Sequence, residues 1–287
     1  MNFYKWIDEN TNRLDGKYVG ITGSTGGLGK EICNFLGYLG ANLILIDRNR
    51  KRSEEHKEIL ISKYNIEVLC ITCDMEDIYS IDSAINYLKK YKLDYLILNA
   101  GAYKVKRHET NLGVDNLFQI NNLSPYKLVK GLIDNVNHFV MVSSIAYGMA
   151  KYNQDNYDYK NKSDMKTYGN SKRFLMYSLI NLASNKMIRL SIGHPGITPT
   201  NIIANYPKWL KAIIKYPMKW LFISPKKASL AIVKCMFEES LDSWYGPMIF
   251  NIWGKPGKKK IKYNSNEANK MITINESIIN KNQDLGN

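Results

Sequence analysis

The stretch that decides the fold is Lys17–Asp47, KYVGITGSTGGLGKEICNFLGYLGANLILID. It contains an apolar strand at Lys17–Thr22, a glycine-rich turn, a helical segment at Leu28–Leu39 and a second apolar strand at Asn42–Asp47. Strands this continuously apolar are typical of a parallel sheet covered on both faces. The turn lets the backbone approach an anion, which the unpaired N–H groups of the helix N-terminus attract. We therefore predict a βαβ unit that binds nucleotide phosphates, rather than an ordinary glycine-rich turn.

The same alternation of strand and helix continues along the chain. Further strands are predicted at Glu67–Thr72, Tyr95–Asn99, His138–Ser143 and Arg189–Gly193. Helical periodicity covers Arg52–Tyr64, Ile78–Tyr91, roughly Gly113–Asn135, Tyr168–Lys186, and a segment from Ser224-Pro225 to about Phe237. Because parallel strands are joined by right-handed crossovers, the pattern predicts an α/β fold: a doubly wound parallel sheet (Rossmann fold) with helices on both faces.

Residues 1–255 are predicted to form a single domain, without an internal repeat or a dividing linker. Three segments depart from the alternating pattern: the polar insertion Ala146–Lys166, the aromatic and basic stretch Thr200–Phe222, and the Lys/Asn-rich end Lys255–Asn287. We expect residues 256–287 to form a basic, partly disordered C-terminal tail.

The composition is that of a basic globular protein. The 287 residues include 40 Lys and Arg against 26 Asp and Glu, which gives a net charge of +14. The excess is concentrated in Arg48–Arg52, in residues 207–227 and in Lys255–Lys262, and none of these segments contains an acid. Local clusters suit a cofactor phosphate or an anionic lipid surface, and no nucleic-acid recognition motif accompanies them.

Sequence features also indicate a compartment. The N-terminus carries acids and no apolar core, and no apolar run approaches the length of about 18 residues that spans a bilayer. Four cysteines do not make a disulfide framework, so we expect a cytoplasmic protein. Neither Cys70-x-x-Cys73 nor the four histidines have metal-ligand spacing, and no metal site is predicted. A homo-oligomer is compatible with the sequence, which does not define the oligomeric state.

The ends of the second and third strands bear on cofactor choice. Asp47 stands where an acidic side chain meets the adenosine ribose, which favours NAD because a carboxylate repels a 2′-phosphate. Arg48 follows directly and could pair with that phosphate, which favours NADP. We give NAD a slight preference, since Asp47 sits at the strand end. Asp74, followed by Met75, suits an adenine contact or a helix cap equally well.

A second constellation points to proton transfer. Tyr168 and Lys172 are four residues apart, so they share one face of the predicted helix. A neighbouring ammonium stabilises phenolate, so the pKa of Tyr168 is expected to fall below its ordinary value of about 10. Ser144 follows the fifth strand, at the carboxyl edge where such sheets bind ligands. A surface Tyr/Lys pair would be the ordinary explanation of this spacing taken alone.

These motifs occur along the chain in the order found in the short-chain dehydrogenase/reductase family, and together they resemble that family over about residues 15–255. Thr22-Gly23-x-x-x-Gly27-x-Gly29 matches the family's cofactor loop, Asp74 its adenine contact and Asn99-Ala100-Gly101 its sheet-stabilising motif. Asn121 resembles the helix residue that supports the proton relay, and Ser144 the residue that orients the substrate. Tyr168 and Lys172 resemble the catalytic pair, and Pro195-Gly196 with Thr200 the loop over the nicotinamide.

The resemblance implies NAD or NADP as cofactor, and a set of residues that holds it. We predict this set to be Gly23, Ser24, Thr25, Gly27, Leu28, Gly29, Asp47, Arg48, Asp74, Met75, Asn99, Ala100, Gly101, Tyr168, Lys172, Pro195, Gly196 and Thr200. The catalytic residues implied are Asn121, Ser144, Tyr168 and Lys172. Tyr168 would exchange a proton with the substrate while Ser144 holds the reacting oxygen.

Two segments, HPGITPT at 194–200 and FQINNLSPYKL at 118–128, resemble the branch of retinol dehydrogenases and their relatives. That branch acts on hydrophobic alcohols and carbonyls, so the resemblance implies a small hydrophobic substrate beneath a lid at about residues 200–222. Within residues 207–227, lysines at helical spacing share one face and apolar residues fall largely opposite. This pattern also suits peripheral contact with a membrane, although a lid whose apolar face packs on the protein is the ordinary explanation.

Other functions use parts of the same pattern. A non-catalytic dinucleotide-binding redox sensor, or a protein that docks on a membrane surface, would need the phosphate loop but not the set Ser144, Tyr168 and Lys172. Reduction of a C=C bond or one step of an epimerisation could use the same residues. The sequence favours alcohol–carbonyl interconversion and leaves the substrate and the direction open.

Overall fold

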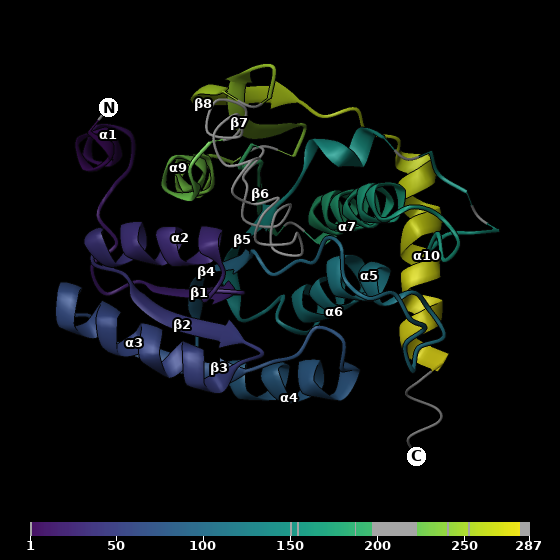
Figure 1. Ribbon diagram of the computed structural model, residues 1–287, viewed down its shortest axis with the longest axis horizontal. Helices are drawn as coiled ribbons and strands as arrows, with labels where there is room; N and C mark the ends of the chain where they lie inside the picture. Colours follow the sequence, from purple (N-terminus) through teal and green to yellow (C-terminus); the bar gives the residue numbers. More distant parts are fainter. Residues whose placement is uncertain are drawn as a thin grey trace, which may run out of the picture.

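The protein folds around one mostly parallel sheet (Figure 1). This computed structural model describes residues 2–149, 151–153, 155–186, 188–196, 223–239, 241–251 and 253–281. Within them, the sheet has eight strands in the order β3-β2-β1-β4-β5-β6-β7-β8. The strands are β1 (Tyr18–Thr22), β2 (Asn42–Asp47), β3 (Val68–Thr72), β4 (Leu93–Leu98), β5 (Val136–Val142), β6 (Arg189–Gly193), β7 (Ser243–Ile249) and β8 (Trp253–Lys260). Only β8 pairs antiparallel, on β7.

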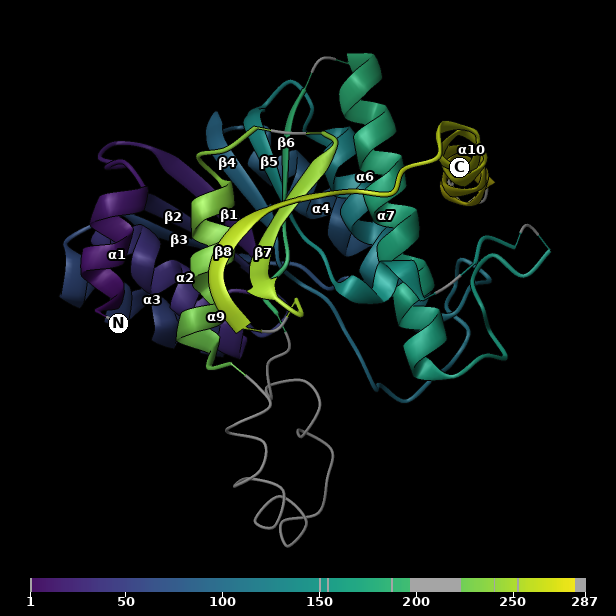
Figure 2. The same ribbon diagram turned by 90° about the horizontal axis from the view of Figure 1, so that it is seen from above.

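Helices cover both faces of the sheet (Figure 2). One face carries α1 (Phe3–Asn10), α2 (Gly27–Tyr38), α3 (Arg50–Tyr64) and α9 (Pro225–Cys235). The other carries α4 (Ile78–Leu88), α5 (Asn116–Phe118), η1 (Gln119–Leu123), α6 (Ser124–Gly131) and α7 (Asp164–Lys186), with α10 (Ser265–Lys281) packed outside α7. A short 3₁₀ turn, η2 (Ile145–Gly148), precedes α7.

Alternate strand residues build the two cores. In β2, Ile44 and Ile46 join the core beneath α4, α6 and α7, whereas Leu43 and Leu45 join the core beneath α2 and α9. This is the two-sided burial that the apolar strands predict, and it confirms the doubly wound sheet. The six predicted strands agree with the observed ones to within two residues at each end.

The C-terminal segment differs from the expectation. Residues 256–281 are not disordered: they complete β8 and form α10, while residues 282–287 lie outside the described part. Asn264 caps α10 by accepting a hydrogen bond from the backbone N–H of Glu267, and Met271 and Ile278 of the helix are buried. Tertiary packing on α7 therefore orders a segment whose composition alone predicts disorder.

The predicted helix over Gly113–Asn135 is interrupted. It is observed as α5, a π-helical turn η1 and α6, which together cover Asn116–Gly131. π-turns inside helices occur frequently at functional sites, and Asn121 lies in this one.

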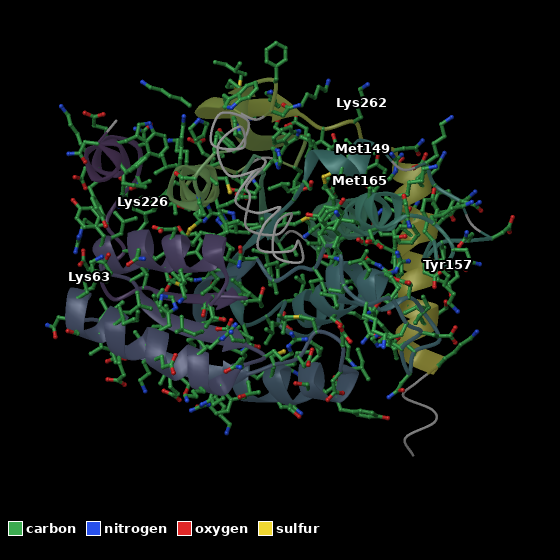
Figure 3. All side chains as sticks on the ribbon, in the orientation of Figure 1. Lys63, Met149, Tyr157, Met165, Lys226 and Lys262 are labelled. Carbon is green, nitrogen blue, oxygen red and sulfur yellow. The ribbon has the colours of Figure 1, made fainter. Side chains whose placement is uncertain are left out.

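The stretch predicted as a lid, residues 200–222, lies outside the described residues. Of the predicted membrane-contact segment, residues 207–227, the structure describes Ile223–Lys227. There, the Lys226 ammonium lies 4.7 Å from the ring centre of Tyr4. Figure 3 labels Lys226. Among the described residues, no helix combines the length and the apolar character needed to cross a bilayer.

Candidate active site

A cavity of about 510 Å³ opens at the carboxyl edge of the sheet. Its walls come from the ends of β1, β2, β3, β4 and β5 and from the start of α7. In doubly wound sheets this edge, near the point where strand order reverses between β1 and β4, is where ligands bind. The cavity is large enough to hold part of a dinucleotide together with a small substrate.

The phosphate loop is built around two close backbone approaches. Gly23 has a φ of +69°, and a Cβ there would lie 2.9 Å from Cα of Ala100. A Cβ on Gly29 would lie 2.2 Å from the carbonyl oxygen of Gly23. Only glycine fits at either position, so the loop keeps its N–H groups open at the start of α2. This cradle fits a pyrophosphate.

Asn99 and Ala100 hold the loop in place. The Asn99 side chain donates hydrogen bonds to the carbonyls of Thr22 and Gly23, both at 3.0 Å. The backbone N–H of Ala100 donates to the Thr22 hydroxyl at 2.9 Å. The Asn99-Ala100-Gly101 motif thus ties the end of β4 to the end of β1, as the resemblance implies.

Asp47 is buried, and its carboxylate is already saturated. One oxygen accepts from the backbone N–H and the hydroxyl of Thr25, at 3.1 and 3.0 Å. The other accepts from the hydroxyls of Ser24 and Ser53, the latter at 3.3 Å. A carboxylate offers about four lone-pair sites, and four donors occupy them here. Asp47 therefore holds the phosphate loop on β2, with little capacity left for ribose hydroxyls.

Arginines line the same end of the cavity. Arg48 and Arg52 both face it, and the Arg48 side chain is 72% exposed. The Arg48 guanidinium lies 3.9 Å from the carboxylate of Asp74. Asp74 accepts from the backbone N–H of Glu76 in a turn, whereas Asp77 caps α4. The helix-cap interpretation of Asp74 is therefore wrong, and its carboxylate borders the cavity.

The Tyr168–Lys172 pair lies on one face of α7, as the spacing predicts. Lys172 is buried, its ammonium donates to the carbonyl of Val142 at 3.1 Å, and it lies 5.9 Å from the ring centre of Tyr168. Burial lowers the pKa of Lys172 to about 8. Burial also raises the pKa of Tyr168 to about 12, against the opposing effect of the Ser144 hydroxyl.

This result corrects the expectation that Lys172 lowers the pKa of Tyr168. Desolvation of the phenol is the larger effect, and the neighbouring ring of Tyr103, with centroids 5.3 Å apart, acts in the same direction. In the protein without ligands, Tyr168 is therefore a neutral phenol at physiological pH.

The two serines that follow β5 have different environments. The Ser143 hydroxyl is buried against the sulfur of Met176, at 3.8 Å. The Ser144 hydroxyl accepts from the backbone N–H of Ala146, at 3.3 Å, and its residue lines the cavity beside Tyr168. Both serines line the cavity, and the role predicted for Ser144 toward a substrate oxygen stays a prediction.

Asn121 lies behind the cavity wall. Its side chain donates to the carbonyls of Ala102 and Leu117 and accepts from the N–H of Ala102, at 2.9, 2.8 and 3.1 Å. A Cβ on Gly101 would lie 2.8 Å from the Asn121 side-chain oxygen and 3.4 Å from the Lys172 ammonium. Gly101 is therefore required by the close approach of these two polar groups.

The outer end of the cavity is mostly apolar. Tyr103, Val105, Ile145, Met149 and Met165 line it. Figure 3 labels both methionines near the start of α7. Unbranched, polarizable Met side chains adapt to irregular apolar partners. The arrangement suits an apolar substrate group beside Tyr168.

The cavity unites most of the predicted site. Seventeen predicted residues line it: Gly23, Thr25, Gly27, Leu28, Gly29, Asp47, Arg48, Asp74, Met75, Asn99, Ala100, Gly101, Ser144, Tyr168, Lys172, Pro195 and Gly196. Ser24 and Asn121 are buried behind the wall, and Thr200 lies outside the described residues. Sequence reasoning missed Arg52 and Tyr103 as lining residues, and it also missed the two methionines. The sequence signal that could have found Met165 is its position three residues before Tyr168, which places both side chains on one face of the helix.

A phosphate loop at this edge, with a Tyr–Lys pair facing the same cavity, defines an oxidoreductase that uses a nicotinamide dinucleotide. The comparisons with known proteins agree. The family model described as short chain dehydrogenase matches residues 17–211. The chain belongs to the short-chain dehydrogenase/reductase family and is an NAD(P)-dependent oxidoreductase.

Individual relatives place the chain near the retinol dehydrogenase-like branch. The short-chain dehydrogenase TIC 32 A, chloroplastic, of Brassica napus is 29% identical over 221 residues, which cover 68% of each chain. Retinol dehydrogenase 12 of Mus musculus is 27% identical over 246 residues, 82% of this chain and 77% of that protein. A solved structure from Mycobacterium paratuberculosis covers 94% of this chain and 95% of its own, with a TM-score of 0.73 and 20% identity, which supports the fold.

Proposed function

We propose that the protein reduces the carbonyl group of an apolar aldehyde or ketone with NADPH. The observation that carries the proposal is that one continuous cavity contains the glycine-rich phosphate loop, Arg48, Tyr168 and a group of apolar side chains. When bound, the nicotinamide supplies the hydride. The residues of this chain bind, orient and protonate.

Each residue near the reacting carbon has a distinct task. The Ser144 and Tyr168 hydroxyls hold the carbonyl oxygen, and their hydrogen bonds strengthen as negative charge develops on it. Tyr168 then transfers its proton to that oxygen. The Lys172 ammonium, fixed by the Val142 carbonyl, holds the ribose hydroxyls and stabilises the phenolate that remains. Asn121 positions the loop at Ala102 beside this pair.

The protonation state of Tyr168 favours reduction over oxidation. A phenol whose pKa is raised to about 12 is available as a proton donor throughout the neutral range. Alcohol oxidation would need the phenolate, which burial disfavours. The proposed direction in the cell is therefore carbonyl to alcohol.

The cofactor end supports NADPH. Since four donors saturate Asp47, its carboxylate is directed to the loop, and the exposed Arg48 guanidinium is available for a 2′-phosphate. Arg52 faces the same end of the cavity. These contacts oppose the slight preference for NAD that the strand-end position of Asp47 suggests.

The substrate is proposed from the apolar end of the cavity. Retinol dehydrogenase 12, a relative by sequence, carries in its name an alcohol with a long apolar chain. The adaptable pair Met149 and Met165 suits the same kind of group here.

The test is initial-rate oxidation of NADPH and of NADH with a series of aldehydes of increasing chain length. We expect kcat/KM to rise with apolar length and to be higher with NADPH. In Arg48→Ala, the ratio of NADPH to NADH activity should fall about tenfold to a hundredfold, because a charge-assisted pair is lost. Arg50→Ala is the matched control, since Arg50 pairs with Glu54 away from the cavity. An unchanged ratio in Arg48→Ala would contradict the NADPH assignment.

A further inference from the structure

The tip of the β7–β8 hairpin exposes three consecutive apolar side chains. Met248, Ile249 and Phe250 are 49%, 53% and 80% exposed. The Phe250 ring also contacts that of Trp253, with centroids 6.4 Å apart. The other large exposed apolar side chains of the described residues do not form such a contiguous group. They are separate residues on α3, on α4 and just after β8, or they line the cavity. A contiguous apolar group on a surface usually marks an interaction site.

The turn itself does not require a phenylalanine. Phe250 and Asn251 have φ values of +50° and +58°, the left-handed region that favours glycine and asparagine. Asn251 suits its position, whereas a bulky aromatic residue at φ above zero is strained there. An aromatic side chain that is both strained and exposed indicates a role outside folding.

Lysines follow the tip along β8. Lys255 is the nearest of the exposed ones, whereas Lys258 and Lys260 pair with Tyr245 and Ser243, farther from the turn. The hairpin and its exit, Ser243–Lys262, carry five lysines and no acid. Lys259 braces the tip by donating to the Met248 carbonyl at 3.2 Å and to the Asn251 side chain. Lys255, Lys258, Lys260 and Lys262 are exposed. Lysines on an edge strand deter aggregation, but that role does not account for an apolar tip beside them.

The tip lies at the same edge of the molecule as the site. Because β7 runs parallel to β6, its end at Ile249 reaches the carboxyl edge of the sheet. His194, which lines the cavity, lies 3.2 Å from the carbonyl oxygen of Asn251 through its ring nitrogen Nε2. A surface that engages the tip would therefore also lie close to the cavity.

We propose that the β7–β8 tip docks the protein on an anionic lipid surface. Met248, Ile249 and Phe250 enter the interfacial region, and the exposed lysines of β8 meet the headgroups. Apolar insertion combined with lysine–headgroup attraction is the usual basis of peripheral membrane binding. Docking in this way directs the cavity toward a bilayer, from which an apolar substrate can enter. The proposal does not depend on the cofactor or on turnover.

The experiment is co-sedimentation of the full chain with vesicles of phosphatidylcholine, with and without phosphatidylserine, at low and high salt. We expect binding only with phosphatidylserine, and weaker binding at high salt. Phe250→Gly should lower the apparent partition coefficient about tenfold or more. It should leave the thermal midpoint unchanged or higher, since glycine accepts a positive φ. A purely structural role would lower the midpoint instead.

Two controls separate this surface from general charge. Lys255→Glu/Lys258→Glu should abolish vesicle binding, whereas Lys89→Glu/Lys90→Glu, which changes net charge equally at the end of α4, should retain it. Tyr79→Ser removes another exposed aromatic side chain, 63% exposed, from α4, and this variant should also bind normally. The proposal fails if phosphatidylserine does not increase vesicle binding by the parent protein, which is the result expected of a surface that binds an acidic protein instead. It also fails if Phe250→Gly binds vesicles as strongly as the parent protein does.

Discussion

The buried ammonium of Lys172 lowers the stability of the folded state. Its ammonium is buried and donates to one carbonyl, that of Val142, so its pKa falls from 10.5 to about 8. Below pH 8 the lysine is protonated in the folded and unfolded states alike, and the folded state bears the full desolvation cost. The cost declines as the pH rises from about 8 toward 10.5. This cost to folding supports the role in cofactor binding and proton transfer proposed for Lys172.

Lys172→Met should therefore stabilise the protein while it inactivates the enzyme. We expect the free energy of unfolding to rise by about 3 kcal/mol at pH 7, and the gain to shrink near pH 10. Denaturant unfolding at both pH values measures it. Lys127→Met is the control: Lys127 is also buried but pairs with Asp82 at 2.7 Å, so its removal should bring no gain. A destabilised Lys172→Met would show that the ammonium is well compensated in the fold.

Tyr168→Phe tests proton transfer at the reacting oxygen. Loss of the hydroxyl should reduce kcat by about 10²- to 10⁴-fold, the usual contribution of a general acid. Cofactor affinity, followed by fluorescence titration, should change little. Tyr103→Phe keeps the ring that packs on Tyr168 and should retain turnover within a few-fold. Near-normal turnover in Tyr168→Phe would remove the proposed role.

We expect the same two groups to set the pH dependence of the proposed reduction. Tyr168 keeps its proton well above neutral pH, so the first loss of activity should come from Lys172. We expect kcat/KM to be level near neutral pH and to decline above about pH 8, because this parameter reports groups of the free enzyme. A decline that begins below pH 7 would point to a different titrating group.

At the scale of elements, α10 is joined to the core by a buried polar cluster. Asn275 is fully buried, accepts from the Asn122 amide at 2.7 Å and donates to the Ser178 hydroxyl at 3.1 Å. Outside this cluster, Glu267 pairs with Arg173 of α7. A satisfied polar network of this kind specifies one docking position of a helix.

Asn275→Ala should lower the free energy of unfolding by about 2–3 kcal/mol, because Asn122 and Ser178 would be left buried without partners. Chemical denaturation followed by circular dichroism measures the change. Asn280→Ala, on an exposed position of the same helix, should stay within about 0.5 kcal/mol. Equal effects of the two substitutions would argue against the cluster as the anchor of α10.

The elements that sequence predicts well are those with a strong local signal. The runs NLILID and HFVMVS mark β2 and β5 clearly. Because these strands are buried on both faces, their apolar residues are continuous rather than alternating with polar ones. The run WGKPGKKK of β8 has little strand character, and only its pairing with β7 makes it a strand. The helix α10 has apolar spacing at Ala268, Met271 and Ile278, but its Lys/Asn content masks it.

The site follows the same division. Spacing and order were sufficient to predict that Gly23, Tyr168 and Lys172 lie at one cavity, because the proposed chemistry needs those residue types at those positions. The engagement of Asp47 by Thr25 and Ser53 could not be foreseen, since it depends on side-chain orientation across a turn. Met149 and Tyr103 come to the cavity by loop paths that have no sequence period.

At the scale of the whole molecule, cofactor binding should be coupled to folding. A ligand that binds only the folded state at about 100 times its Kd adds roughly 2.7 kcal/mol of stability. We expect NADPH to raise the thermal midpoint more than NADH at equal concentration, and Arg48→Ala to abolish the difference. Arg50→Ala should keep it, and equal midpoints with both cofactors in the parent protein would speak against discrimination at Arg48.

The π-turn η1 has a consequence for the register of its helix. A π-turn amounts to one residue inserted into an α-helix, and each residue advances the helix by about 100°. The insertion lets Asn121 face Ala102 while Tyr126 and Leu128 of α6 still face the core. Deleting one residue between Gln119 and Leu123 would restore an ordinary helix, but it would rotate one of these two faces out of place. The helix therefore satisfies the demands of packing and of the site with a single extra residue.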